Sequence, residues 1–87
     1  MKDVDFSICP FIKKELSFLT YYDFCDNAIA IRDLYKKLSN EEKQFYKWFV
    51  YSNIHMREYY KDLIWGYLND HITRKILMEN RKRYKIK

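Results

Sequence analysis

Glycine and proline are almost absent from this 87-residue chain, which contains only Gly66 and Pro10. At average usage a chain of this length would contain about six glycines and about four prolines. Tight hairpins and phosphate-binding loops depend on residues that accept a positive φ angle, and glycine is the main one. The shortage therefore argues against a β-sandwich, a P-loop and a dinucleotide-binding turn.

Cysteines and long apolar runs are also scarce. Two cysteines, Cys9 and Cys25, are too few for a disulfide scaffold. The first ten residues, MKDVDFSICP, include acids and no long apolar run, so we expect no signal peptide. No apolar stretch approaches the roughly 18–20 residues of a membrane span. We expect a cytoplasmic protein with free thiols in a reducing setting and no membrane partner.

Motifs for catalysis or metal binding are missing as well. The residues that could bind zinc are each sixteen or more positions from the next, namely Cys9, Cys25, His55 and His71. Zinc sites place their ligands much closer together in the sequence. No nucleophile elbow, HExxH, Walker or GxGxxG motif is present. We therefore expect no enzyme activity, no catalytic residue, no metal and no cofactor.

Hydrophobic periodicity predicts an all-α fold, a small single-domain bundle of four helices (three to five) over residues 1–87. Residues 1–8 form an irregular N-terminal arm in this interpretation. A first helix then runs from Pro10, which suits a first helical position, to about Tyr21. Its apolar residues share one face (Ile12, Leu16 and Leu19).

Two further helices carry clearer signals. Asp23 is the expected N-cap of the second helix. Its apolar residues follow at steps of four and three, namely Phe24, Ala28, Ile31, Tyr35 and Leu38. Ser39 and Glu42 form a capping box, which predicts a third helix from about Asn40. We expect its inner face to hold Phe45, Phe49, Ser52 and Met56, flanked by Trp48.

Residues 40–68 are either one long helix or two helices with a break near Ser52 and Asn53. We favour the break, because a chain this short must fold back on itself to close a core. The next helix groups its apolar residues, namely Tyr60, Leu63, Ile64, Tyr67 and Leu68. A last helix, capped by Asn69 and Asp70, contains Ile72, Ile76 and Leu77, and residues 81–87 form a basic, frayed tail.

Aromatic residues are in surplus between residues 45 and 67, where nine occur (Phe45, Tyr46, Trp48, Phe49, Tyr51, Tyr59, Tyr60, Trp65 and Tyr67). Each buries on the order of 150–250 Å², so a core this small does not enclose them all. In one continuous helix, Tyr51 and Trp65 would lie near Lys47 and Lys61, opposite the main group, which includes Tyr59, and would be exposed. With a break, Tyr51 and Trp65 would instead pack under the first helix or the N-terminal arm.

Positive charge is concentrated at the C-terminal end of the chain. Residues 71–87 have seven Lys or Arg and one acid, whereas residues 1–70 have a net charge of −1. A basic cluster suits phosphates or an acidic protein groove, although cations also stabilise a helix C-terminus. We expect partner binding by residues in both regions (Tyr51, Trp65, Lys47, Lys61, Arg74, Lys75, Arg81, Lys82, Arg83, Tyr84 and Lys85), with Tyr84 stacking on a base. Truncation after Asn80 should then leave the fold intact.

These features predict a non-catalytic binding or inhibitor protein that docks on a nucleic-acid-handling protein or a ribonucleoprotein. The profile is similar in size, surface and lack of chemistry to small proteins of phages and mobile elements that block host machines, anti-CRISPR proteins among them. No motif carries this similarity. Two alternatives are direct binding of RNA or another single-stranded nucleic acid, and a structural module that forms a homodimer through its aromatic face.

Overall fold

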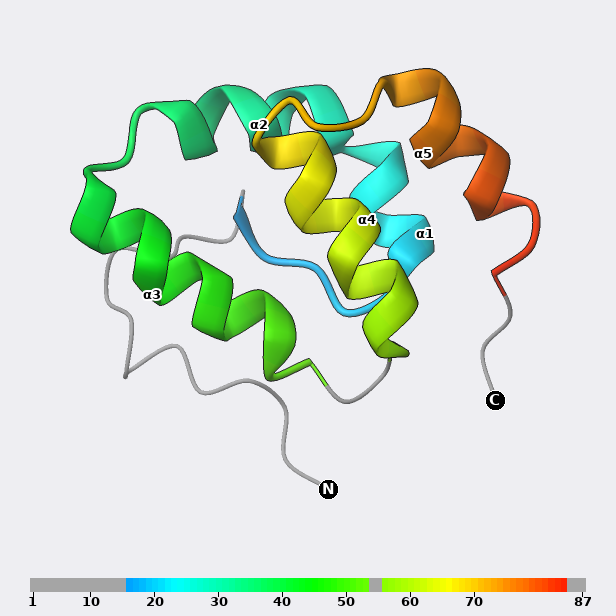
Figure 1. The fold of residues 1–87 in the computed structure, drawn as a ribbon, viewed down its shortest axis with the longest axis horizontal. Coiled ribbons are helices and arrows are strands. Elements are labelled where there is room, and N and C mark those ends of the chain that lie inside the picture. Colours follow the sequence, from blue (N-terminus) through cyan, green and yellow to red (C-terminus); the bar gives the residue numbers. More distant parts are fainter. Residues whose placement is uncertain (1–15, 54–55, 85–87) are drawn as a thin grey trace.

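A computed structural model describes residues 16–53 and 56–84, and within these ranges the chain forms five helices and no strand (Figure 1). The helices are α1 (Tyr21–Asp26), α2 (Ala28–Lys36), α3 (Asn40–Tyr51), α4 (Glu58–Leu68) and α5 (Arg74–Arg81). The all-α prediction is confirmed. No helix in the described ranges is long and apolar enough to cross a membrane. The predicted N-terminal arm, the helix start at Pro10, His55 and Lys85 lie outside these ranges.

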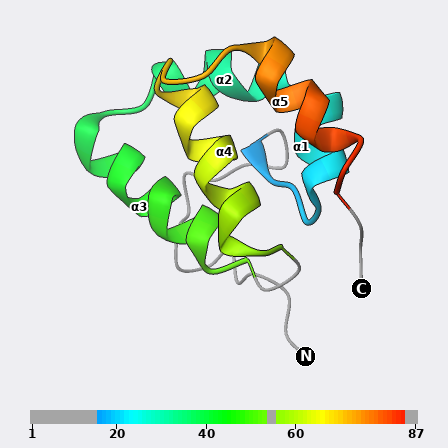
Figure 2. The same ribbon diagram turned by 45° about the vertical axis from the view of Figure 1, so that its right-hand side comes forward.

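Helix α4 is the centre of the fold and contacts each of the other four helices. In Figures 1 and 2, α3 lies on one side of α4 and α5 on the other, with α1 and α2 behind. The core is correspondingly built around residues of α4, and Ile64, Tyr67 and Leu68 are fully buried. The surfaces of α3 and α5 that face away from α4 are therefore well separated.

The predicted apolar stripe of the second helix is confirmed, because Phe24, Ala28, Ile31 and Tyr35 are all buried. The stripe spans two helices, however, because α1 ends before Asn27 and α2 begins after it. The predicted N-cap is wrong. Thr20 caps α1 by accepting a hydrogen bond from the backbone N–H of Asp23, which lies in the first turn of the helix.

The predicted helix from Pro10 to Tyr21 is wrong for residues 17–20, which are not helical. Side chains from distant helices bind the carbonyl groups of this segment. The Tyr46 hydroxyl donates to the Leu16 carbonyl at 2.6 Å, and the buried Asn53 amide donates to the carbonyls of Phe18 and Leu19. These bonds satisfy backbone groups that would otherwise need helical partners. Leu16 is buried, whereas Leu19 is exposed.

Helix α3 begins as predicted, with both hydrogen bonds of the capping box between Ser39 and Glu42 present. Its inner face is rotated from the predicted one, because Tyr46, Phe49 and Val50 are buried. Burying Tyr46 leaves no unpaired hydroxyl, since the Leu16 carbonyl accepts its hydrogen bond. The opposite rotation would have buried Phe45 instead, and that residue is exposed.

The predicted break after α3 is confirmed, since Ser52 is the C-cap of α3 and α4 begins after Arg57. Arg57 is the N-cap of α4, four residues after Asn53. Asn53 is buried and binds the Phe18–Leu19 segment, as described above. Met56 is buried as predicted.

The turn between α4 and α5 also differs from the prediction. Thr73, rather than Asn69 or Asp70, caps α5 by accepting from the Ile76 N–H. Asn69 instead accepts a hydrogen bond from the Tyr35 hydroxyl, and Asp70 adopts a left-handed conformation with φ of 62°. Such a φ is uncommon outside glycine, although aspartate tolerates it. Leu77 is buried as predicted, whereas Ile76 is 40% exposed.

Residues 81–84, the part of the predicted tail that the structure describes, pack on the fold, since Arg81 belongs to α5 and Tyr84 is buried. The Tyr84 ring packs against the rings of Tyr21, Tyr22 and Tyr60. The Tyr22 hydroxyl donates to the Tyr84 carbonyl. Tyr84 is thus a core residue, and the prediction that it stacks on a base is wrong.

Candidate binding surfaces

Trp65 and Tyr51, the aromatic residues predicted to contact a partner, are both half-buried. Because the chain breaks before α4, Trp65 packs against α2. Its ring lies edge-on against that of Tyr35, with the ring centroids 5.5 Å apart. The Tyr51 hydroxyl donates to Asp62 at 2.6 Å. Burial and the adjacent Asp62 carboxylate raise the Tyr51 pKa, so this hydroxyl stays protonated. The Tyr51 hydrogen bond joins α3 to α4, and the Trp65 contact joins α4 to α2.

Lys47 and Lys61 lie beside these two aromatics, although the continuous helix for which the sequence predicted this arrangement does not form. The Lys47 ammonium is 5.7 Å from the centre of the Trp65 ring, a cation–π arrangement. The Lys61 ammonium donates to the Tyr51 carbonyl at 3.0 Å, near the end of α3. The structure therefore places these four residues close together, and each lysine contacts one of the two aromatic residues.

The basic residues of α5 and of the two positions after it are mostly accessible. Arg74, Lys75, Lys82 and Arg83 are exposed, and within residues 16–53 and 56–84 none of the four forms an ion pair. Arg81 differs, because it pairs with Asp26 at 3.0 Å and lies over the Tyr22 ring. The four accessible cations form the basic face of α5.

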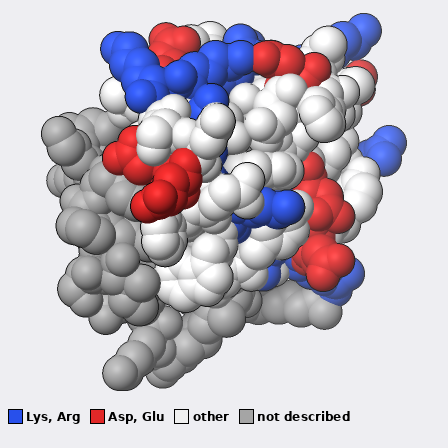
Figure 3. All heavy atoms as spheres, turned by 60° about the vertical axis from the view of Figure 1, so that its left-hand side comes forward, with Lys and Arg blue, Asp and Glu red and all other residues white. Residues whose placement is uncertain are grey.

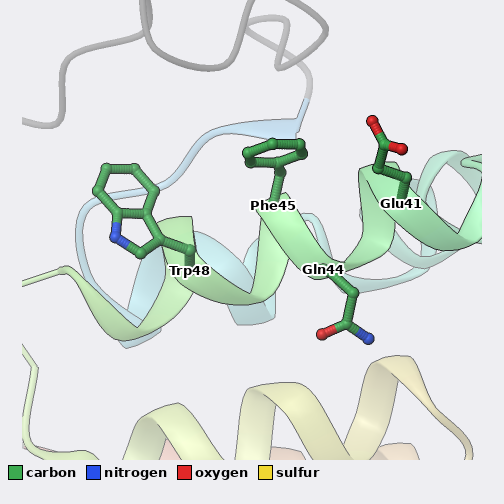
Figure 4. A pocket seen from close by; sticks show the side chains of 4 residues that line it. All are labelled: Glu41, Gln44, Phe45 and Trp48. Carbon is green, nitrogen blue, oxygen red and sulfur yellow. The ribbon is translucent and has the colours of Figure 1, made fainter.

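A more exposed aromatic pair lies on α3, where the sequence had indicated an inner face. Phe45 is 45% exposed and Trp48 is 46% exposed. Figure 4 shows both rings projecting from one side of α3, together with Glu41, whereas Gln44 points elsewhere. These residues line a hollow of about 640 Å³. We call Phe45 and Trp48 the α3 patch.

The sequence contained a signal for the α3 patch. Phe45 and Trp48 are three residues apart, so both project from one face of a helix. Tyr46, Phe49 and Val50 form a second such group, and periodicity alone does not say which group faces inward. Figure 3 shows the side of the molecule formed by α3, with a central uncharged area and charged groups around it.

Several buried titratable residues of the described chain, Cys25, Tyr21 and Tyr46, are held in their neutral forms. No group of three or more His, Cys, Asp or Glu side chains that could hold a metal occurs in the described residues. Burial raises the pKa of the Cys25 thiol to about 11, so the thiol is neutral and unreactive near pH 7. Burial likewise raises the pKa values of Tyr21 and Tyr46.

The chain was compared with known proteins at the level of sequence and of structure. No protein-family model matches it, no curated protein matches it, and no solved structure matches it.

Proposed function

We propose that this is a non-catalytic binding protein that docks on a protein partner through the α3 patch. The observation that carries the proposal is the exposure of Trp48, which is 46% accessible one helical turn from the similarly exposed Phe45. Tryptophan is among the residues that dominate binding energy at protein interfaces, where it fills pockets of the partner. The partner surface that fits is an apolar groove with a cation near Glu41.

The basic face of α5 supports a partner that handles nucleic acid. Four exposed cations that form no ion pair with any described residue create a positive field that attracts acidic or phosphate-bearing surfaces. A ribonucleoprotein offers an apolar protein groove and phosphates in one assembly. We propose that the protein inhibits such an assembly, as a cytoplasmic factor of the host-takeover or anti-defence type, similar in general character to anti-CRISPR proteins.

The test is affinity capture from the lysate of the cell in which the protein acts, with and without nuclease. The bait proteins are the wild type, Trp48→Ala and the control Ile29→Ala, which removes another exposed apolar side chain, on α2. We expect the wild type and Ile29→Ala to capture a nucleic-acid-handling protein in stoichiometric amount, and to retain it after nuclease treatment. Trp48→Ala should not capture this protein.

Two outcomes would contradict the proposal. Equal capture by all three baits would show that the α3 patch is not the docking surface. A dimer in light scattering that Trp48→Ala converts to a monomer would show that the patch binds a second copy of the chain.

A further inference from the structure

Tyr59, at the start of α4, is an exposed aromatic ring held in place at both ends. Its hydroxyl donates to the side-chain oxygen of Asn80 at 2.9 Å, and its ring meets Tyr60 edge-on with centroids 5.1 Å apart. The side chain is nevertheless 55% exposed. A ring that is fixed but open loses little conformational freedom when a ligand stacks on it.

The partner of Tyr59 places its hydroxyl at the C-terminal end of α5. Asn80 lies on α5, and it lines a hollow of about 310 Å³ together with Glu79, Lys82 and Arg83. Lys82 and Arg83 are exposed and directly follow the helix. Asn80 thus contacts the Tyr59 hydroxyl and also lines the hollow that Lys82 and Arg83 border.

The cations continue along α5 away from Tyr59. Lys75 precedes Lys82 by two helical turns, so the two lie on the same outer side of the helix, about 10 Å apart along its axis. Arg74 adds a further charge at the start of the helix, and Glu79 is the acid among them. This arrangement suits a ligand with several negative charges spaced along a chain.

We infer that Tyr59 and the basic face of α5 bind a single-stranded nucleic acid. A base stacks on the exposed Tyr59 ring, and the adjoining phosphates contact Lys82, Arg83 and Lys75. Base stacking on aromatic side chains combined with a basic track is how proteins bind single strands without sequence preference. A duplex keeps the faces of its bases covered, and an acidic peptide supplies charge without a flat ring. The inference rests on the proposed role of the α5 face and is independent of the α3 patch.

The test is fluorescence anisotropy of the full chain with a labelled 12-nucleotide oligouridine, a duplex RNA of equal length and a polyglutamate peptide. We expect the single strand to bind more tightly than the other two. About three phosphate contacts predict a slope near −2 in a plot of log affinity against log salt concentration. Tyr59→Ala should weaken binding about tenfold or more, whereas Tyr59→Phe, which keeps the ring, should retain most of it.

A charge-matched pair of variants locates the phosphate contacts. Lys82→Ala/Arg83→Ala should weaken oligouridine binding and flatten the salt slope. Lys37→Ala/Lys43→Ala removes the same charge from the C-cap of α2 and from α3 and should leave binding unchanged. Trp48→Ala should also bind oligouridine normally, which separates this inference from docking through the α3 patch.

Three results would overturn the inference. These are an unchanged affinity of Tyr59→Ala for oligouridine, tighter binding of the duplex or of polyglutamate, and no binding of the single strand at low salt. Capture of a protein through Trp48 could still stand in each case. Conversely, oligouridine binding that depends on Tyr59 would stand even if the Trp48 experiment failed.

Discussion

The ring of Tyr84 meets the ring of Tyr60 edge-on, with centroids 4.9 Å apart and planes at 86°. This contact joins the segment after α5 to the central helix α4. The same ring lies 5.6 Å from Tyr21 of α1, whose hydroxyl donates to the Leu77 carbonyl at 2.7 Å. The C-terminal end of the described chain is therefore part of the core.

Tyr84→Ala should lower the free energy of unfolding by about 3–5 kcal/mol, because it removes a buried aromatic ring and leaves a cavity. Tyr59→Ala is the matched control, since it deletes the same side chain at an exposed position and should cost about 1 kcal/mol. Urea denaturation followed by circular dichroism measures both. Truncation after Asn80 should likewise destabilise the fold, contrary to the expectation from sequence. Equal stability losses for the two variants would contradict the buried position of Tyr84.

The two tryptophans should contribute differently to the stability of the fold. Trp65→Ala should cost roughly 2–3 kcal/mol, less than a fully buried aromatic, because Trp65 is half-buried against Tyr35. Trp48→Ala should cost less than about 1 kcal/mol, because much of its ring is already in water. Thermal and urea melts of the two variants check this order. The reverse order would show that Trp48 is the core residue.

Asn53→Ala should lower the free energy of unfolding by about 1–3 kcal/mol, because the carbonyls of Phe18 and Leu19 lose a buried donor. Asn27→Ala is the control. Its amide also donates to a carbonyl, that of Asp23, but at an exposed site, so it should cost only about 0.5 kcal/mol. Urea denaturation of both variants tests the difference. A neutral Asn53→Ala would mean that residues 16–20 are not held by this side chain.

Stability should fall at alkaline pH. Burial raises the Cys25 pKa from 9.0 to about 11, so between these values the folded state binds more protons than the unfolded state. The stability that Cys25 supplies is therefore fully present below pH 9 and is lost as the pH rises toward 11. Urea denaturation from pH 7 to pH 10.5 measures this loss. In Cys25→Ala the free energy of unfolding should fall less steeply with pH. If it falls as steeply as in the wild type, the loss comes from buried tyrosines such as Tyr21 and Tyr46.

Features set by neighbouring residues were predictable from the sequence. The capping box of Ser39 and Glu42 depends on two residues three positions apart, and it is present. The stripe from Phe24 to Tyr35 follows from helical periodicity alone, and it is buried. The break after Ser52 followed from the need of a short chain to close a core.

Features set by distant residues were not predictable. The segment from Leu16 to Thr20 resembles a helix locally, but Tyr46 and Asn53 bind its carbonyls from about thirty positions away. Tyr84 lies in a basic run typical of an exposed tail, yet three tyrosines enclose it. For the same reason the exposed aromatics of the described chain are Phe45, Trp48 and Tyr59, whereas Tyr51 and Trp65 are half-buried.

The most direct test of the proposed function is the affinity of the captured protein partner, purified and titrated calorimetrically with the wild type, Trp48→Ala and Ile29→Ala. An anchor tryptophan contributes about 2 kcal/mol or more at an interface. We therefore predict that Trp48→Ala weakens binding about 30-fold or more, while Ile29→Ala binds like the wild type. Equal affinity of the wild type and Trp48→Ala would contradict docking through the α3 patch.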